Sequence, residues 1–183
     1  MFGKRRFFMI EFDKLSLRDS SPYPEVMAAR ENKRLAAQIS ALYAGQNSEL
    51  TSVAGYTYNS FVLSESYGEY AEVFRKMAAV EMHHLSLLGQ LMIKLGGDPV
   101  FGDVSGSPQS PVYWQGSNVS DERRPLNVFY GALRGEQAAY NGYISLARRC
   151  GDRYVFALLT RIALDEMLHA AAIKAMIVNY QRV

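Results

Sequence analysis

The stretch AAVEMHHLSLLGQ, residues 78–90, places Glu81, His83 and His84 in the middle of an apolar segment. Burying an ionised carboxylate costs several kcal/mol unless a partner compensates its charge. Glu81 and His84 are three residues apart and therefore share one face of a helix. His83 points about 100° away from His84, so we interpret it as a surface or interface histidine. The stretch thus predicts a buried Glu-x-x-His pair that needs partners from elsewhere in the chain.

A second Glu-x-x-His pair, Glu166 and His169, occurs in the sequence DEMLHAAA near the other end of the chain. A single glutamate precedes each pair at a similar distance: Glu49 before the first pair and Glu136 before the second. If each half folds as an antiparallel helical hairpin, its single glutamate lies level with its Glu-x-x-His pair. Two hairpins packed face to face then place four carboxylates and two imidazoles in one buried layer.

Such a layer is untenable without cations, because four buried negative charges repel one another and lack solvent. Two divalent ions bring as many positive charges as the four carboxylates bring negative ones. Oxygen ligands combined with two imidazoles suit iron or manganese better than a thiolate-binding metal. The sequence therefore predicts a dinuclear metal site formed by Glu49, Glu81, His84, Glu136, Glu166 and His169.

Helical periodicity covers most of the chain, and no strand-like alternation is sustained, so the predicted fold class is all-α. Proline and glycine mark the helix ends. The predicted domain organisation is an N-terminal extension, residues 1–23, followed by a four-helix bundle, residues 24–183. The four predicted helices cover residues 24–63 (with a bend at Gly45), 69–95, 125–149 and 153–180.

The connections between these helices predict their order in space. Short links around Gly68 and Gly151 imply antiparallel neighbours. Residues 96–123 are rich in Gly, Pro and Ser and could span about 90 Å when extended. A link of that length can run along the whole bundle and let the second and third helices point the same way. We therefore expect two antiparallel hairpins joined by one long crossover.

Composition excludes several classes of protein. A chain of 183 residues is expected to form one domain, and its net charge of +2 gives no basic field for nucleic acid. The single cysteine, Cys150, forms no intramolecular disulfide and is typical of a reducing compartment. The apolar run at residues 7–10 is too short for a signal peptide, and no run is long enough to span a membrane. We therefore expect a cytoplasmic protein.

The order Glu, Glu-x-x-His, Glu, Glu-x-x-His resembles the ligand plan of the ferritin-like di-metal carboxylate proteins, which include bacterioferritin, rubrerythrin and manganese catalase. The resemblance covers about residues 24–180. It implies that Glu81 and Glu166 bridge two metal ions and that each ion receives one further glutamate and one histidine. It also implies iron as the first choice of metal and manganese as the second, with zinc as a substitute in recombinant protein.

Asp165, directly before Glu166, occupies a place from which an aspartate in similar proteins reaches the histidine of the opposite motif. We therefore expect Asp165 to hold His84, because metal-bound histidines donate their second N–H to an acceptor. Val80 occupies the equivalent place before Glu81, so the two halves of the chain differ here.

Three tyrosines follow the single glutamates by about one or two helical turns. Tyr56 follows Glu49 by seven residues and resembles the site-adjacent tyrosine of rubrerythrins, while Tyr140 and Tyr143 follow the second single glutamate by four and seven. We expect Tyr56 and Tyr140 to take part in catalysis by binding a ligand carboxylate or donating a proton. For Tyr143 we expect ordinary core packing.

The chain departs from rubrerythrins in two ways. Ala139 stands where they carry an additional glutamate, and a single cysteine excludes a rubredoxin-like domain, so any electrons must come from a separate donor protein. The leading prediction is a rubrerythrin-like di-iron oxidoreductase that acts on hydrogen peroxide or dioxygen in oxidative-stress defence. The alternatives are a manganese catalase, a ferroxidase or iron-storage protein, and a metal-stabilised structural or coat protein. By analogy we expect a homo-oligomer, a dimer or larger, that binds neither nucleic acid nor membranes.

Overall fold

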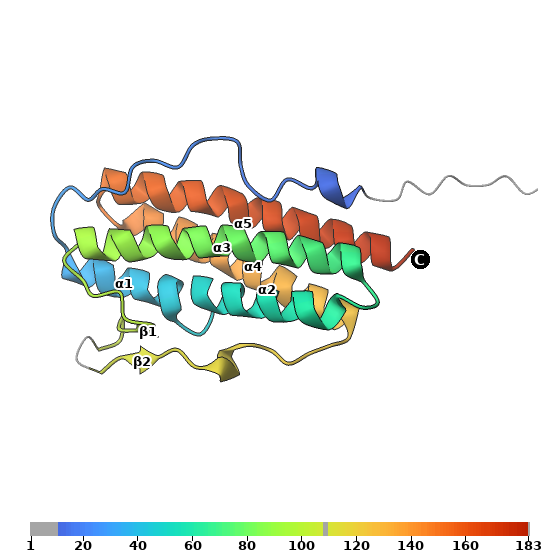
Figure 1. Ribbon diagram of the computed structural model, residues 1–183. Helices are drawn as coiled ribbons and strands as arrows, with labels where there is room; N and C mark the ends of the chain where they lie inside the picture. Colours follow the sequence, from blue (N-terminus) through green and yellow to red (C-terminus); the bar gives the residue numbers. More distant parts are fainter. Residues whose placement is uncertain (1–10, 108–109, 183) are drawn as a thin grey trace, which may run out of the picture.

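The computed structural model describes residues 11–107 and 110–182. Four helical rods pack side by side in a bundle, and the first rod consists of two shorter helices (Figure 1). The predicted all-α, ferritin-like four-helix bundle is confirmed. The helices are α1 (Lys33–Ala44), α2 (Glu49–Leu63), α3 (Gly68–Lys94), α4 (Pro125–Arg149) and α5 (Arg153–Tyr180).

The rods form two antiparallel hairpins, and one long crossover joins the hairpins, as predicted. Helices α2 and α3 form one hairpin, and α4 and α5 form the other. The crossover runs beneath α2 along the length of the bundle, so that α3 and α4 point the same way (Figure 1). Trp114 anchors it by donating from Nε1 to the Thr51 hydroxyl at 2.9 Å. The crossover also contains two very short antiparallel strands that the sequence did not indicate, β1 (Gly102–Asp103) and β2 (Val112–Tyr113).

Local sequence signals explain why three of the helices lie where predicted. Pro125 is the first residue of α4, a position at which proline is favoured. Gly96 has a φ of 76°, which suits the residue that follows the end of α3. The side chain of Asp152 accepts hydrogen bonds from the backbone N–H groups of Tyr154 and Val155 and caps α5.

The first rod differs from the prediction at its start, because α1 begins at Lys33 and not at Pro24. Asn32 caps α1 by accepting a hydrogen bond from Leu35 N at 3.0 Å. The preceding residues are held in a non-helical conformation by tertiary hydrogen bonds. Ala29 N donates to Asp152 Oδ2 at 2.7 Å, and Asn32 N donates to the carbonyl of Leu95 at 2.9 Å. These contacts outweigh the local helix signal of the proline.

The bend expected at Gly45 is a complete interruption between α1 and α2. A Cβ atom at Gly45 would approach the carbonyl oxygen of Ala41 to 2.5 Å, so this turn requires glycine. Ser48 then caps α2 with its side chain and makes Glu49 the first residue of the new helix. A carboxylate in the first turn of a helix interacts favourably with the positive end of the helix dipole.

The interior consists of two apolar clusters with a polar layer between them. One cluster lies near α1 and includes Leu88 and Ile162, and the other lies near the opposite end and includes Phe74 and Ile173. On α3 the buried members of the two apolar clusters stop at Ala78 and resume at Leu85, and the other rods show a corresponding gap. The buried charged side chains occupy these gaps.

The N-terminal part of the described chain runs along the outside of the bundle over α5 (Figure 1). Within residues 11–107 and 110–182, no helix combines the length and the apolar character that a membrane crossing requires.

Candidate metal centre

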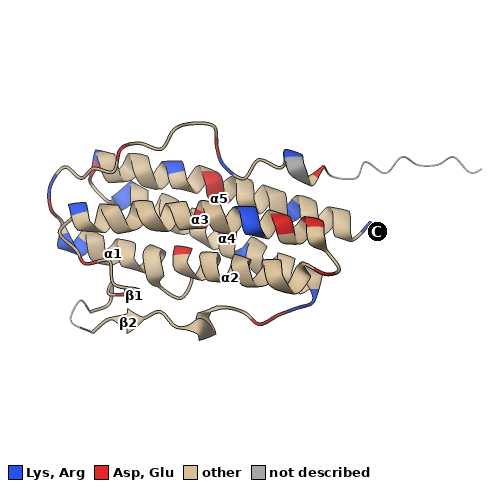
Figure 2. Cartoon of the chain, in the orientation of Figure 1, with Lys and Arg blue, Asp and Glu red and all other residues tan. Residues whose placement is uncertain are grey.

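The structure brings all six predicted ligand side chains together halfway along the bundle. Each is at most 4% exposed, although each carries an ionisable group. Figure 2 shows acidic positions midway along the rods, including the start of α2 and the middle of α5. The six residues, Glu49, Glu81, His84, Glu136, Glu166 and His169, form the site cluster discussed below.

The site cluster divides into two overlapping groups of four possible ligands. One group contains Glu49 and His84, the other contains Glu136 and His169, and Glu81 and Glu166 belong to both. The ligand atoms of each group lie within 4.8 Å of one another. The geometry therefore offers two adjacent positions for an ion that share two carboxylates.

Both histidines direct Nδ1 toward the carboxylates. Nδ1 of His84 lies 3.1 Å from one oxygen of Glu81 and 3.1 Å from one oxygen of Glu166. Nδ1 of His169 lies 3.0 Å from Oε1 of Glu81 and 3.5 Å from Oε2 of Glu136. The imidazoles thus point into the centre of the layer from α3 and from α5.

Several of these buried atoms have no hydrogen bond, although they lie close together. Among the described residues this group comprises Oε1 of Glu81, Oε1 of Glu166 and both ring nitrogens of His169. Nδ1 of His169 and Oε1 of Glu81 are 3.0 Å apart, but their orientation is unsuited to a hydrogen bond. Buried polar atoms are nearly always satisfied, and lone pairs that converge on a common point are typical of metal ligands.

Two tyrosines connect the hairpins by contacting the single glutamate of the opposite half. Tyr56 on α2 donates its hydroxyl proton to Oε1 of Glu136 on α4. Tyr143 on α4 donates to Oε1 of Glu49 on α2. The predicted position of Tyr140 in the site was wrong: it is half-buried and packs against the apolar cluster near α1. Tyr143 packs in that apolar cluster, as expected, and its hydroxyl in addition contacts a ligand carboxylate, that of Glu49.

Asp165 lies behind His84, where the sequence placed it. Its Oδ2 is 3.1 Å from Nε2 of His84. Tyr23, which the sequence analysis missed, donates its hydroxyl proton to the same oxygen and lies 3.2 Å from Nε2 of His84. His83 is exposed, as predicted, and its ring packs edge-on against the Tyr23 ring.

Arg161 was also missed, although the sequence contained a signal for it. It lies four residues before Asp165 in an otherwise apolar segment, and oppositely charged residues at this spacing pair on a helix. Its Nη1 donates to Oδ1 of Asp165 at 2.8 Å, and Arg161 is only 5% exposed. No pattern in the N-terminal residues pointed to Tyr23.

Burial and neighbouring charges shift the pKa values of the site cluster in opposite directions. Burial raises the pKa of Glu49 and of Glu136 well above the usual value, and the charge of Glu81 raises both further. Burial also acts to raise the pKa of Glu81, but His169 and His84 together outweigh this effect and lower that pKa. Without metal, protons on Glu49 and Glu136 therefore offset part of the negative charge.

The histidine pKa values follow the same logic. Burial acts to lower the pKa of His84 and of His169. The hydrogen bond of His84 to Asp165 and the nearby carboxylate of Glu166, 3.1 Å from Nδ1, raise the pKa of His84 well above its usual value. The charges of Glu81 and Glu136 do the same for the pKa of His169. In the metal-free protein both imidazoles are therefore protonated, and a metal ion would have to displace the proton on Nδ1 of each.

A family comparison identifies the group of proteins to which this bundle is related. The family model described as rubrerythrin matches residues 41–177. The chain belongs to the rubrerythrin family. The matched range contains all six residues of the site cluster but not Tyr23. Membership in this ferritin-like family implies a di-metal site of iron or manganese, and the buried carboxylate and histidine cluster agrees with that expectation.

Solved structures share the fold of this rubrerythrin-family protein. Wild-type KatB, a manganese catalase from Anabaena, superposes with a TM-score of 0.78 at 18% identity over 90% of this chain and 80% of its own. A bacterioferritin-related protein from Bacteroides fragilis, described as a dodecameric thioferritin, has a TM-score of 0.66 at 17% identity over 84% of this chain and 90% of its own. No curated protein sequence matches the chain.

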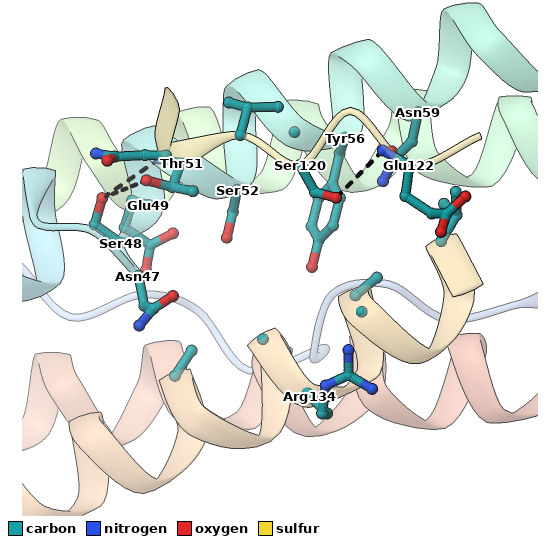
Figure 3. A pocket seen from close by; sticks show the side chains of 18 of the residues that line it. Asn47, Ser48, Glu49, Thr51, Ser52, Tyr56, Asn59, Ser120, Glu122 and Arg134 are labelled. Atoms are coloured by element: carbon teal, nitrogen blue, oxygen red, sulfur yellow. Dashed lines mark hydrogen bonds between the residues drawn. The ribbon is translucent and has the colours of Figure 1, made fainter. Parts of the chain in front are cut away.

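A cavity of about 540 Å³ leads to the site cluster between α2 and α4. Glu49, Tyr56 and Tyr143 line it together with asparagine and serine side chains of α2 and the crossover. In Figure 3, Glu49, Ser52 and Tyr56 point from α2 into this space toward α4. Ala139, which stands where rubrerythrins carry an additional glutamate, also lines the cavity. The wall of the passage combines polar and apolar side chains, and its volume suits a small molecule.

The pKa shifts predict how the stability of the rubrerythrin-family protein depends on pH after a chelator has removed all metal. A group whose pKa is raised in the folded protein stabilises the fold fully below its unfolded pKa. That unfolded value is about 4.5 for Glu49 and Glu136 and about 6.5 for His84 and His169. That contribution is lost as the pH rises through the folded values. We expect the melting temperature to fall between pH 6 and pH 8, by roughly 3–5 °C per pH unit for each proton involved.

Thermal unfolding of the chelated protein, followed by circular dichroism, measures this dependence. Glu81, whose lowered pKa acts in the opposite sense, destabilises the fold only below about pH 4.5, so the two effects occupy different pH ranges. A melting temperature that rises steadily from pH 6 to pH 8 would contradict the assigned pKa directions.

Proposed function

We propose that the site cluster binds two metal ions and that the protein is a non-haem di-metal oxidoreductase acting on hydrogen peroxide or dioxygen. The observation that supports this most strongly is the convergence of unpaired carboxylate and imidazole atoms from both hairpins in a buried layer beside a cavity. Iron is the metal we expect first, and a separate protein would supply electrons.

The donor set fits two such ions. Glu49 and His84 would hold one ion, Glu136 and His169 would hold the other, and the two remaining glutamates, Glu81 and Glu166, would bridge them. The negative charge of four ionised carboxylates equals the positive charge of two divalent cations, and the two neutral imidazoles add none, so the filled site would be neutral. Hard oxygen ligands with imidazole favour iron or manganese over metals that prefer sulfur. When bound, the ions would supply Lewis acidity and electron exchange with the oxidant.

The side chains around the site cluster would bind and orient the oxidant. The apolar clusters on both sides exclude water from the layer, and the cavity between α2 and α4 gives access to one edge of it. Burial and the charge of Glu136 raise the pKa of Tyr56 well above its usual value, so its hydroxyl remains protonated. Tyr56 and Tyr143 would fix the orientation of Glu136 and Glu49 and hold protons next to the cavity.

A manganese catalase is the second candidate, and Ala139 favours it. At that position the cavity wall offers a methyl group and no further carboxylate, which leaves the simple set of four glutamates and two histidines. Catalase activity needs no electron donor, because two peroxide molecules disproportionate to water and dioxygen. The shared fold with KatB is consistent with this candidate.

Peroxide consumption by protein loaded with a defined metal tests the proposal. The protein is freed of metal and reloaded with iron(II) or manganese(II) without oxygen. Peroxide loss and dioxygen release are then followed with and without a reduced electron-transfer protein. Elemental analysis of protein purified from its own host identifies the metal bound in the cell.

The outcomes separate the candidates. Peroxide loss by the iron form that requires the donor supports the oxidoreductase, and dioxygen release by the manganese form without a donor supports the catalase. Accumulation of ferric mineral in an assembled cage supports iron storage. Loss of stability on metal removal with no turnover of any form supports a structural role and refutes an enzyme.

The two cross-hairpin tyrosines should matter for turnover, whereas Tyr140 should not. We expect Tyr56→Phe and Tyr143→Phe each to lower peroxide turnover by about 10- to 100-fold, because residues that orient metal ligands typically contribute that much. Metal content measured by elemental analysis should stay at the wild-type level. Tyr140→Phe on the same helix as Tyr143 is the matched control and should keep full turnover. Equal losses in all three variants would contradict the assigned contacts.

A further inference from the structure

The two histidines of the site cluster differ in what lies behind them. Nε2 of His84 is 3.1 Å from Oδ2 of Asp165 and 3.2 Å from the Tyr23 hydroxyl. Nε2 of His169 has no hydrogen-bond partner among the described residues, although His169 is completely buried. The residue before Glu81, which corresponds to Asp165 in the other half, is Val80, and its side chain cannot accept a hydrogen bond.

Asp165 is itself held by several donors. Its Oδ1 accepts the backbone N–H of Asp19 at 2.6 Å and Nη1 of Arg161 at 2.8 Å. Its Oδ2 accepts the hydroxyl proton of Tyr23. With a metal ion on Nδ1 of His84, Nε2 would keep the remaining proton and donate it to Asp165. A metal ligand held in this way has a fixed tautomer and ring orientation.

Residues 19–23, here called the N-terminal strap, supply much of this support. Arg161 donates from Nε to the carbonyl of Ser21 at 2.8 Å and from Nη2 to the carbonyl of Asp19 at 2.9 Å. Its guanidinium also lies 4.1 Å from the centre of the Tyr23 ring. The strap, Arg161 and Asp165 therefore form one network that ends at His84.

We propose that the N-terminal strap makes the two metal positions unequal. Through Tyr23 and Asp165 it fixes His84, so the position of Glu49 and His84 binds its ion more tightly than the position of Glu136 and His169. Tyr23 acts as a positioning residue and does not contact the ion. The inference rests on the proposed function only in requiring that the site cluster binds two ions.

Titration of the full-length, metal-free protein with manganese(II), followed by electron paramagnetic resonance, tests this inference. We expect the first equivalent to give the spectrum of an isolated ion and the second to convert it to that of a coupled pair. The two dissociation constants should differ by about 10- to 100-fold, the typical effect of a hydrogen-bonding partner on a metal ligand. With equal and independent positions, about a quarter of the molecules would already hold two ions at one equivalent.

Three variants assign the tighter step to its position. His84→Ala should abolish the tight step, whereas His169→Ala should abolish the weak step and keep the tight one. Tyr23→Phe keeps the ring beneath Arg161 and removes only the hydroxyl, so it should weaken the tight step about tenfold and leave the weak step unchanged. Tyr67→Phe is the matched control, because its hydroxyl lies 3.3 Å from that of Tyr180, on the end of the last helix.

Each outcome decides the matter. Two equal affinities in the wild type, a tight step that survives in His84→Ala, or an unchanged tight step in Tyr23→Phe would overturn the inference while leaving the di-metal proposal intact. Failure to bind manganese(II) at all would overturn both. Melting curves of the metal-free variants show whether the Tyr23→Phe effect is local, because general loss of stability would weaken both steps equally.

Discussion

Replacing Glu81 with glutamine should lower peroxide turnover by at least about a thousand-fold and should weaken the binding of both metal ions. Glu81 belongs to both groups of ligand atoms, so glutamine removes one negative charge from each position without changing the shape of the side chain. Metal ions contribute several kcal/mol to the stabilisation of a transition state, and each 1.36 kcal/mol corresponds to a tenfold change in rate. Turnover of the reloaded protein and its metal content by elemental analysis measure the two effects.

Glu72→Gln is the matched control for this variant. Glu72 lies on the same helix, α3, but it is partly exposed and pairs with Arg75 at 2.6 Å on the surface. We expect full turnover and the full metal content in Glu72→Gln. Retention of two tightly bound ions in Glu81→Gln would show that Glu81 does not bridge them and would require a different assignment of the ligands.

Removal of the metal ions by a chelator should lower the melting temperature by roughly 15–30 °C at neutral pH. A ligand present at a thousand times its dissociation constant stabilises the folded state by about 4 kcal/mol, and two ions double that. For a chain of this length each kcal/mol changes the melting temperature by about 2–4 °C. Differential scanning calorimetry of chelated, untreated and reloaded protein measures the change, and reloading should restore it.

Glu136→Gln should change stability in opposite directions in the two states. In the metal-free protein the ionised form of Glu136 is disfavoured by burial and by the charge of Glu81, as its raised pKa shows. Glutamine is neutral without taking up a proton and can still accept the hydroxyl proton of Tyr56, so at neutral pH the metal-free variant should melt at a higher temperature than the wild type. In the loaded protein the same change removes a ligand and should lower the melting temperature. A decrease in both states would contradict the charge-repulsion argument.

The sequence was sufficient for the helices whose ends carry strong local signals. Pro125, Gly96 and Asp152 punctuate the chain so clearly that α3, α4 and α5 lie within one residue of their predicted bounds. The ligands were equally visible, because charged residues at positions that helical periodicity assigns to the interior need a common explanation. The beginning of the first helix was not predictable, since hydrogen bonds to Asp152 and to the carbonyl of Leu95 decide it.

Helix geometry explains why Tyr143, and not Tyr140, contacts a ligand carboxylate. At about 100° per residue, a residue four positions after Glu136 lies about 40° from it around the helix, and one seven positions after lies about 20° from it. Tyr143 therefore follows the glutamate more closely, with the spacing that Tyr56 has from Glu49.

Neither hairpin contains a complete site. The metal position formed by Glu49 and His84 also includes Glu166 from the second hairpin. The position formed by Glu136 and His169 also includes Glu81 from the first hairpin. Each hairpin consists of neighbouring helices and relies on contacts that are short-range in sequence, which form early, whereas docking of the two halves closes the long crossover. The site cluster is therefore complete only after the two hairpins have docked. Before docking, each hairpin offers an incomplete set of ligands and should bind an ion only weakly.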